Sequence, residues 1–185
     1  MASSLSIPPQ SSPALLIESE FGSATAWVVD CRPAEDGYDV TVVTAGHFVT
    51  PDNPPPYVLD GSLVTHDTGK THPTEDFALV TFRSSHYMTP LPLDPRPLVY
   101  GEELTLDGFP EGEGPYRRGG FSGGDIRTST PAWPGDSGGP ISDTDGEVVG
   151  ILVQVIVTPW GDIVSFAAEM VPLVSVNEWL REELQ

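Results

Sequence analysis

The sequence predicts an all-β domain that ends in one short helix. Among its 185 residues are 20 prolines and 19 glycines, enough turn formers to connect many short strands. The apolar segments are short and rich in valine, and only the C-terminal segment has helical periodicity. Because 38% of the residues are hydrophobic and the length suits a single core, we expect one folded domain and not a disordered chain.

The predicted domain covers residues 14–185 and follows a mobile arm, residues 1–13, which is rich in serine and proline. The first ten residues have neither the basic nor the apolar region of a signal peptide, and no apolar run reaches the roughly 20 residues that span a membrane. Cys31 is the single cysteine, so we expect no disulfide within the chain. A cytoplasmic location is therefore expected.

The strand predictions begin with a hairpin, in which residues 24–30 and 38–45 are joined by the polar, Gly-containing loop 31–37. Residues 90–97 contain four prolines and are predicted to be an extended crossover between two halves of the molecule, with the boundary at 90–98. Further strands are predicted at 77–82, 104–109, 147–157 and 163–169, and irregular loops at 51–56 and 111–124.

A helix is predicted at the C-terminal end. Ser175 and Glu178 form a capping-box pattern, which marks the start of a helix. The apolar residues that follow share one helical face: Val176, Trp179, Leu180 and Leu184. We expect this helix to pack on the β-sheet body.

The charge of the chain is strongly acidic, with 27 acidic and 8 basic residues and a formal net charge of −19. Nucleic acids and anionic membranes bind clustered positive charge, so neither is expected as a partner. We interpret the acidity as a solvated surface that keeps the protein soluble. A salt-rich habitat or a basic substrate is also compatible with it.

The most specific local pattern is PGDSGGP at 134–140. Glycines around Ser137 allow a sharp bend and a close approach to a substrate, and neighbouring N–H groups can converge on an oxyanion there. The segment also fits the G-x-S-x-G pattern of α/β-hydrolases, which place their histidine after the serine. The last histidine is His86, so that alternative is excluded by chain order.

A general base for Ser137 has to come from upstream. His47 follows the β-branched run VVTAG, whereas His66, His72 and His86 lie in loops without such support. A third group should orient the histidine from the start of a buried strand, and Asp76 directly precedes FALV. The competing acids, Asp67 and Glu75, are interpreted as solvated loop residues.

Together, TAGH, DFALV and GDSGGP, in the order His, Asp, Ser, resemble the signature segments of trypsin-like (chymotrypsin-fold) serine peptidases. GEELTLDGFP at 101–110, DGEVVGI at 145–151 and FAA at 166–168 resemble the bacterial, HtrA-like branch. The resemblance implies two six-stranded antiparallel β-barrels with the active site between them and a short C-terminal helix. It also implies an endopeptidase that works through an acyl-enzyme on protein or peptide substrates.

In this resemblance, His47, Asp76 and Ser137 are catalytic, and the N–H groups of Gly135 and Ser137 form the oxyanion hole. Pro131 lines the bottom of the specificity pocket, where an acid would select Arg or Lys, so we expect a small or medium apolar P1 residue. The segment that pairs with the substrate backbone consists of Val153, Gln154 and Val155. Val153 stands where many relatives have a serine that binds the triad acid.

The resemblance also bears on activation. In zymogens of the family, a freed amine of an Ile-Val-Gly-Gly-like N-terminus pairs with the Asp before the nucleophile, and no such segment precedes Phe21. We therefore expect no proteolytic activation, and Asp136 has to find another partner or cap its own loop. Ordering of the loop by substrate or by a regulatory protein partner is the alternative.

Other functional interpretations are weaker. His66, Asp67 and His72 match no common metal-ligand spacing, so neither a metal nor a cofactor is expected. The four tryptophans are interpreted as core or pocket-wall residues, and Arg117-Arg118 as part of a solvated loop or, alternatively, a substrate or partner contact. Two other functions stay open: a catalytically silent binding module, and the protease module of a larger system that a partner activates.

Overall fold

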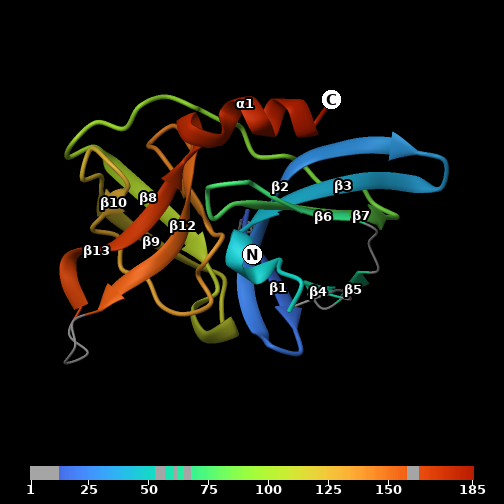
Figure 1. Ribbon diagram of the computed structural model, residues 1–185, viewed down its shortest axis with the longest axis horizontal. Coiled ribbons are helices and arrows are strands. Elements are labelled where there is room, and N and C mark those ends of the chain that lie inside the picture. Colours follow the sequence, from blue (N-terminus) through green and yellow to red (C-terminus); the bar gives the residue numbers. More distant parts are fainter. Residues whose placement is uncertain (1–12, 53–56, 61, 65–67, 158–162) are drawn as a thin grey trace, which may run out of the picture.

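The computed structural model describes residues 13–52, 57–60, 62–64, 68–157 and 163–185, and it confirms the predicted fold class (Figure 1). Two antiparallel sheets lie side by side, and a C-terminal helix, α1 (Leu173–Glu183), runs along one end of both. None of the helices in these ranges is long and apolar enough to cross a membrane.

The first sheet has seven strands in the described residues, where the resemblance implied six, and their order is β5-β4-β1-β2-β3-β7-β6. Its long central strands, β2 and β3, form the predicted hairpin, and β3 also pairs with β7. The bounds are β1 Leu15–Ser19, β2 Gly22–Ala34, β3 Gly37–Thr44, β4 Tyr57–Leu59, β5 Ser62–Val64, β6 Thr68–Thr71 and β7 Ala78–Ser84.

The second sheet has six strands in the order β10-β13-β12-β11-β8-β9. Strands β12 and β13 form its long hairpin, as the apolar runs predicted. The bounds are β8 Glu103–Gly108, β9 Tyr116–Phe121, β10 Arg127–Thr128, β11 Pro140–Ser142, β12 Val148–Val157 and β13 Ile163–Pro172.

Two local predictions are wrong. The predicted loop 111–124 contains strand β9, which pairs with β8 along its whole length. The glycines of this segment made it look like a loop in the sequence. Gly120 is needed in the strand because a Cβ there would collide with the backbone of Thr130. The helix begins at Leu173 and not after a Ser175 cap, since the Ser175 hydroxyl donates a hydrogen bond back to the Pro172 carbonyl at 2.7 Å.

The apolar residues form three clusters, one within each sheet and one between the sheets. The cluster between them joins Trp27 and Phe77 of the first half to Ile151 of the second, all fully buried. Helix α1 closes this junction with Val176 and Leu180, which are 1% and 2% exposed. Because the active-site candidates come from both halves, this cluster sets their relative position.

The chain passes between the sheets in the segment 85–102, which includes the predicted proline-rich crossover. Its backbone is bonded to both halves: the N–H of Leu91 donates to Val28 at 3.0 Å, and the Pro92 carbonyl accepts from Val148 at 2.8 Å. Leu93 also forms an isolated bridge with Val148. The crossover therefore binds the two sheets together as well as connecting them.

Candidate active site

The register of two strands brings His47 and Asp76 together. Strands β3 and β7 are antiparallel, with Thr44 at the end of β3 opposite Ala78 at the start of β7. His47 lies in the 3-10 turn η1 (Gly46–Phe48) just after β3, and Asp76 lies just before β7. Both side chains are therefore held at the same edge of the first sheet.

His47 and Asp76 make two hydrogen bonds. The ring Nδ1 of His47 lies 2.7 Å from Oδ2 of Asp76, and the backbone N–H of His47 donates to Oδ1 at 2.6 Å. The contact fixes the orientation of the ring and uses Nδ1, so Nε2 is the ring nitrogen that remains available to another partner. Asp76, and not the neighbouring Glu75, is the acid in contact with the histidine, while Asp67 lies outside the described residues.

The pair changes the proton affinity of both groups. The hydrogen bond with Asp76, assisted by its charge, raises the pKa of His47 above its ordinary value, although burial works in the opposite direction. Burial raises the pKa of Asp76, but the hydrogen bond and charge of His47 and nearby backbone N–H groups outweigh it and lower the pKa overall. Asp76 is thus ionised at neutral pH, and His47 is a stronger base than an isolated imidazole.

Ser137 comes from the second half and docks against the first. Its carbonyl accepts a hydrogen bond from the N–H of Thr25 in β2 at 2.9 Å. Its half-buried hydroxyl donates to the Val153 carbonyl at 3.0 Å. Among the hydrogen bonds of the described residues, none joins Ser137 to His47.

The loop before and after Ser137 depends on two glycines with positive φ, Gly135 at +97° and Gly138 at +87°. A Cβ on Gly135 would collide with the carbonyl of Phe109. A Cβ on Gly138 would collide with the carbonyl of Thr25 and come within 2.7 Å of the Ala45 nitrogen. The Gly-rich pattern is therefore needed both for the bend and for docking on the first sheet.

The same loop presents two N–H groups. The Pro134 carbonyl accepts a hydrogen bond from the N–H of Glu111 at 2.6 Å. The N–H of Gly135 belongs to the same peptide group and points the opposite way. Within the described part of the chain, neither this N–H nor that of Ser137 has an acceptor, which leaves both available to bind an anionic oxygen.

Asp136, directly before Ser137, has a buried counter-charge. Its side chain is fully buried and lies 2.7 and 2.5 Å from the two terminal nitrogens of Arg118. The N–H of Trp133 donates to the same carboxylate at 2.8 Å. This bidentate pair gives Asp136 the separate partner that the sequence left unidentified.

The interpretation of Arg117-Arg118 as part of a loop is wrong, and only Arg117 is solvated, with 59% of its side chain exposed. Both residues lie in β9, and Arg117 pairs with the buried carboxylate of Asp107 across the strands at 3.0 Å. Arg118 is 15% exposed at its side chain. The charge balance of the sequence could have indicated these roles. The chain has only 8 basic residues and places two of them side by side, and a buried acid needs a basic partner.

Thr25 holds the loop from the first sheet. It is fully buried, and its hydroxyl donates to the Gly135 carbonyl at 2.8 Å and accepts from the N–H of Phe109 at 3.1 Å. Its backbone N–H binds Ser137, and its carbonyl accepts from the Thr44 hydroxyl at 2.8 Å. Every polar group of Thr25 is used, and three of the four contacts reach the second half. No sequence pattern pointed to this residue.

The residues predicted to bind substrate are only partly described. Pro131 is exposed and Val153 is half-buried, with its carbonyl bonded to Ser137. Gln154 is exposed, and its amide donates to Glu169 at 2.5 Å. The side chain of Val155 lies outside the described residues.

The other histidines do not approach Ser137 through any described contact. His72 packs edge-on against Trp179 at 5.1 Å, and its Nδ1 accepts hydrogen bonds from two backbone N–H groups of the following turn. His86 is exposed. His66 and Asp67 lie outside the described residues, so the weak metal-site alternative there stays untested.

A different acidic group, Asp94, Asp143 and Glu147, comes together where the crossover meets the turn before β12. Arg96 lies among these acids, 2.6 Å from Asp94 and 3.4 Å from Asp143. It also pairs with Glu102 at 2.8 Å. The arginine supplies the positive charge of this group, and we assign no metal to it.

Two of the tryptophans agree with their interpretation as core residues. Trp27 is fully buried, and Trp179 packs edge-on against Phe77 at 6.0 Å. Trp133 is 39% exposed and lines a cavity. Trp160 lies outside the described residues.

Comparison with known proteins gives one family and one structural likeness. The family described as trypsin-like peptidase domain matches residues 24–151. The fold is similar to the crystal structure of Rv3671c from M. tuberculosis H37Rv, an inactive form with a serine-to-alanine mutation. The TM-score is 0.69 and the identity 19%, over 92% of this chain and 85% of that one. None of the curated proteins compared with the chain matches it.

The raised pKa of His47 can be measured by NMR titration of its ring protons. We expect a midpoint above the ordinary value of about 6.5 in the wild type, because protonation strengthens the bond to ionised Asp76. In Asp76→Asn the midpoint should fall below that of the wild type. An equal midpoint in both proteins would contradict the assigned contact.

The buried pair of Arg118 and Asp136 should matter for stability. Arg118→Ala leaves a buried carboxylate without its counter-charge, so we expect urea denaturation at neutral pH to show a loss of about 3 to 5 kcal/mol. The control is Arg83→Ala, which breaks the pair with Asp39 whose side chains are 50% and 49% exposed. That change should cost at most about 1 kcal/mol. Equal losses would mean that burial of the first pair has no energetic consequence.

Proposed function

Because the chain belongs to the family of trypsin-like peptidase domains, we propose that it is a serine endopeptidase with His47, Asp76 and Ser137 as its catalytic residues. The observation that carries this proposal is the double contact between His47 and Asp76 at the edge of the first sheet. This contact fixes the His47 ring and raises its basicity, and the Ser137 loop is docked on the same sheet. Its substrates are proteins or peptides.

In the proposed reaction, the Ser137 hydroxyl leaves the Val153 carbonyl and attacks the carbonyl carbon of the scissile peptide bond. His47 takes the hydroxyl proton at Nε2 and donates it to the leaving amine. The acyl-enzyme is then hydrolysed by water, which His47 activates in the same way. Asp76 keeps the proton on Nδ1 and stabilises the imidazolium that forms in each half-reaction.

The oxyanion of each tetrahedral intermediate would be bound by the N–H groups of Gly135 and Ser137. Two observations support this role: the described acceptors leave both groups unused, and the Pro134 carbonyl is held away by Glu111. Donors in such positions are each worth about 3 to 4 kcal/mol in the transition state. Since the donors are backbone groups, their position depends on the loop and not on side-chain identity.

We further propose that the protein needs no proteolytic cut for activation. In zymogens of this family, a new N-terminal amine pairs with the Asp before the nucleophile. Here the bidentate contact of Arg118 with Asp136 already supplies that positive charge from within the second sheet. The support is electrostatic. The buried carboxylate of Asp136 needs one cation, and Arg118 of the same chain supplies it, so no new N-terminal amine is required.

For specificity, we propose a small or medium apolar P1 residue. Pro131 offers no carboxylate to a basic P1 side chain, which would lose its counter-ion on entering the pocket. The net charge of −19 can still attract basic residues elsewhere in a substrate.

A fluorophosphonate probe tests the proposed nucleophile. We expect the wild type to be labelled on Ser137, Ser137→Ala not to be labelled, and His47→Ala to react at least about 100-fold more slowly because its base is missing. Circular dichroism of all three proteins establishes that they are folded. A folded wild type that is not labelled would contradict the endopeptidase proposal and favour the silent or partner-activated alternatives.

A peptide library tests the proposed pocket. Cleavage should follow small and medium apolar residues in the wild type, because position 131 has no charge. In Pro131→Asp, cleavage after Arg or Lys should appear, since the new carboxylate would pair with the basic side chain. Efficient cleavage after Arg or Lys by the wild type would overturn the assignment of Pro131.

A further inference from the structure

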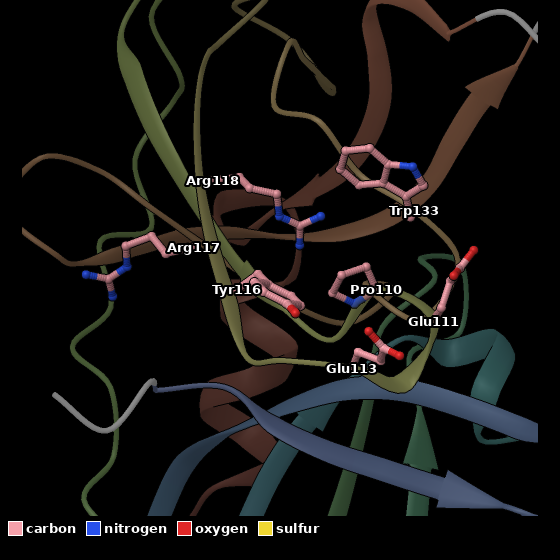
Figure 2. Close-up of a pocket in the computed structure, with 7 residues that line it drawn as sticks. All are labelled: Pro110, Glu111, Glu113, Tyr116, Arg117, Arg118 and Trp133. Atoms are coloured by element: carbon pink, nitrogen blue, oxygen red, sulfur yellow. The ribbon is translucent and has the colours of Figure 1, made fainter. Parts of the chain in front are cut away.

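A cavity of about 370 Å³ lies beside the nucleophile loop. It is formed by the 3-10 turn η2 (Pro110–Gly112), strand β9 and the segment before Gly135. Figure 2 shows the guanidinium of Arg118 near Trp133 and Tyr116, with the carboxylate of Glu113 below them and that of Glu111 at the right, beyond Pro110. The volume falls within the range of small-ligand sites.

In the part of the chain that the structure describes, the basic residues around this cavity are neutralised by acidic partners, whereas its acidic residues are not. The guanidinium of Arg118 is neutralised by Asp136 and that of Arg117, which points away from the cavity, by Asp107. In the described structure, neither Glu111 nor Glu113 has an ion-pair partner. The cavity is therefore lined by two negative charges that have no ion-pair partner among the described residues.

The remaining walls are aromatic. Trp133 and Tyr116 are 39% and 51% exposed, so their rings offer apolar and π surfaces to a ligand. Arg118 already lies 5.4 Å from the centre of the Trp133 ring, which shows that a cation is accepted against this indole. Carboxylates together with aromatic rings are the surroundings that a guanidinium or ammonium group prefers.

The backbone of the cavity is tied to the oxyanion loop. Glu111 has a φ of +54°, a strained conformation for a non-glycine residue, and its N–H holds the Pro134 carbonyl. Arg118, on the opposite wall, holds Asp136. Two residues that line the cavity thus fix both ends of the segment that carries the N–H of Gly135.

We propose that this cavity binds a basic side chain, Arg or Lys, presented by a peptide segment of a partner protein. An anionic ligand would be repelled by Glu111 and Glu113, and a purely apolar one would bury both carboxylates without a counter-charge. The bound cation pairs with Glu111, fixes the strained turn and so holds the Gly135 N–H in place. Its effect on Ser137 rests on the proposed peptidase function, whereas its binding does not.

Binding is tested with the tripeptide acetyl-Ala-Arg-Ala-amide at low ionic strength, with the citrulline peptide as its neutral counterpart. The protein is Ser137→Ala, so that no peptide is cleaved, and the readout is the NMR shift of the Trp133 indole N–H. We expect the arginine peptide to bind, and Glu111→Gln/Glu113→Gln to bind it at least about fivefold more weakly.

The matched control is Glu178→Gln/Glu182→Gln, which removes two exposed charges from α1, away from the cavity lining. It should bind as the unaltered protein does. Equal weakening in both double variants would reduce the effect to net charge and overturn the site. Binding that disappears once the cleft of the wild type is blocked by a fluorophosphonate would place the peptide in the substrate cleft and also overturn it.

The coupling to Ser137 is measured in the wild type as the rate of fluorophosphonate labelling. Saturating arginine peptide should raise this rate about fivefold, the lower end of usual coupling between sites, and should have no effect on Glu111→Gln/Glu113→Gln. An unchanged rate despite binding would overturn the coupling. A wild type that binds the peptide but is never labelled would leave the site in place and refute the peptidase function.

Discussion

The buried ion pair between Arg118 and Asp136 is the constraint on which the Ser137 loop depends. A fully buried carboxylate is costly unless a cation and further donors satisfy it, and here Arg118 and the Trp133 N–H do so. Because Asp136 directly precedes Ser137, satisfying its charge also fixes the backbone that carries the serine. The same ion pair therefore stabilises the buried charge and fixes the geometry of the candidate site.

The rest of the site follows from how the two sheets meet. His47 and Asp76 are placed by the register of β3 and β7, and Ser137 is placed by its loop in the other sheet. Neither half holds all three residues, so the apolar cluster around Trp27 and Ile151, closed by α1, decides their separation. Apolar packing away from these residues thus helps to set their relative position.

Much of this arrangement could be predicted because it depends on local signals. The apolar runs predicted the long strands, and the acid and histidine that flank them predicted the contact of His47 with Asp76. Strand β9 could not be predicted, since its pairing with β8 outweighs the poor strand propensity of its glycines. The partner of Asp136 and the role of Thr25 also arise from contacts distant in sequence, and no local pattern encodes those.

Thr25 also affects the order in which the molecule can form. During synthesis the first sheet emerges first, and its buried threonine then has no partner for its hydroxyl and N–H until the loop around Ser137 arrives. The loop likewise leaves the carbonyls of Gly135 and Ser137 without donors until it meets β2. The buried polar groups on both sides of this contact are therefore satisfied only when the two halves are together, so the first sheet and the Ser137 loop depend on the same contact.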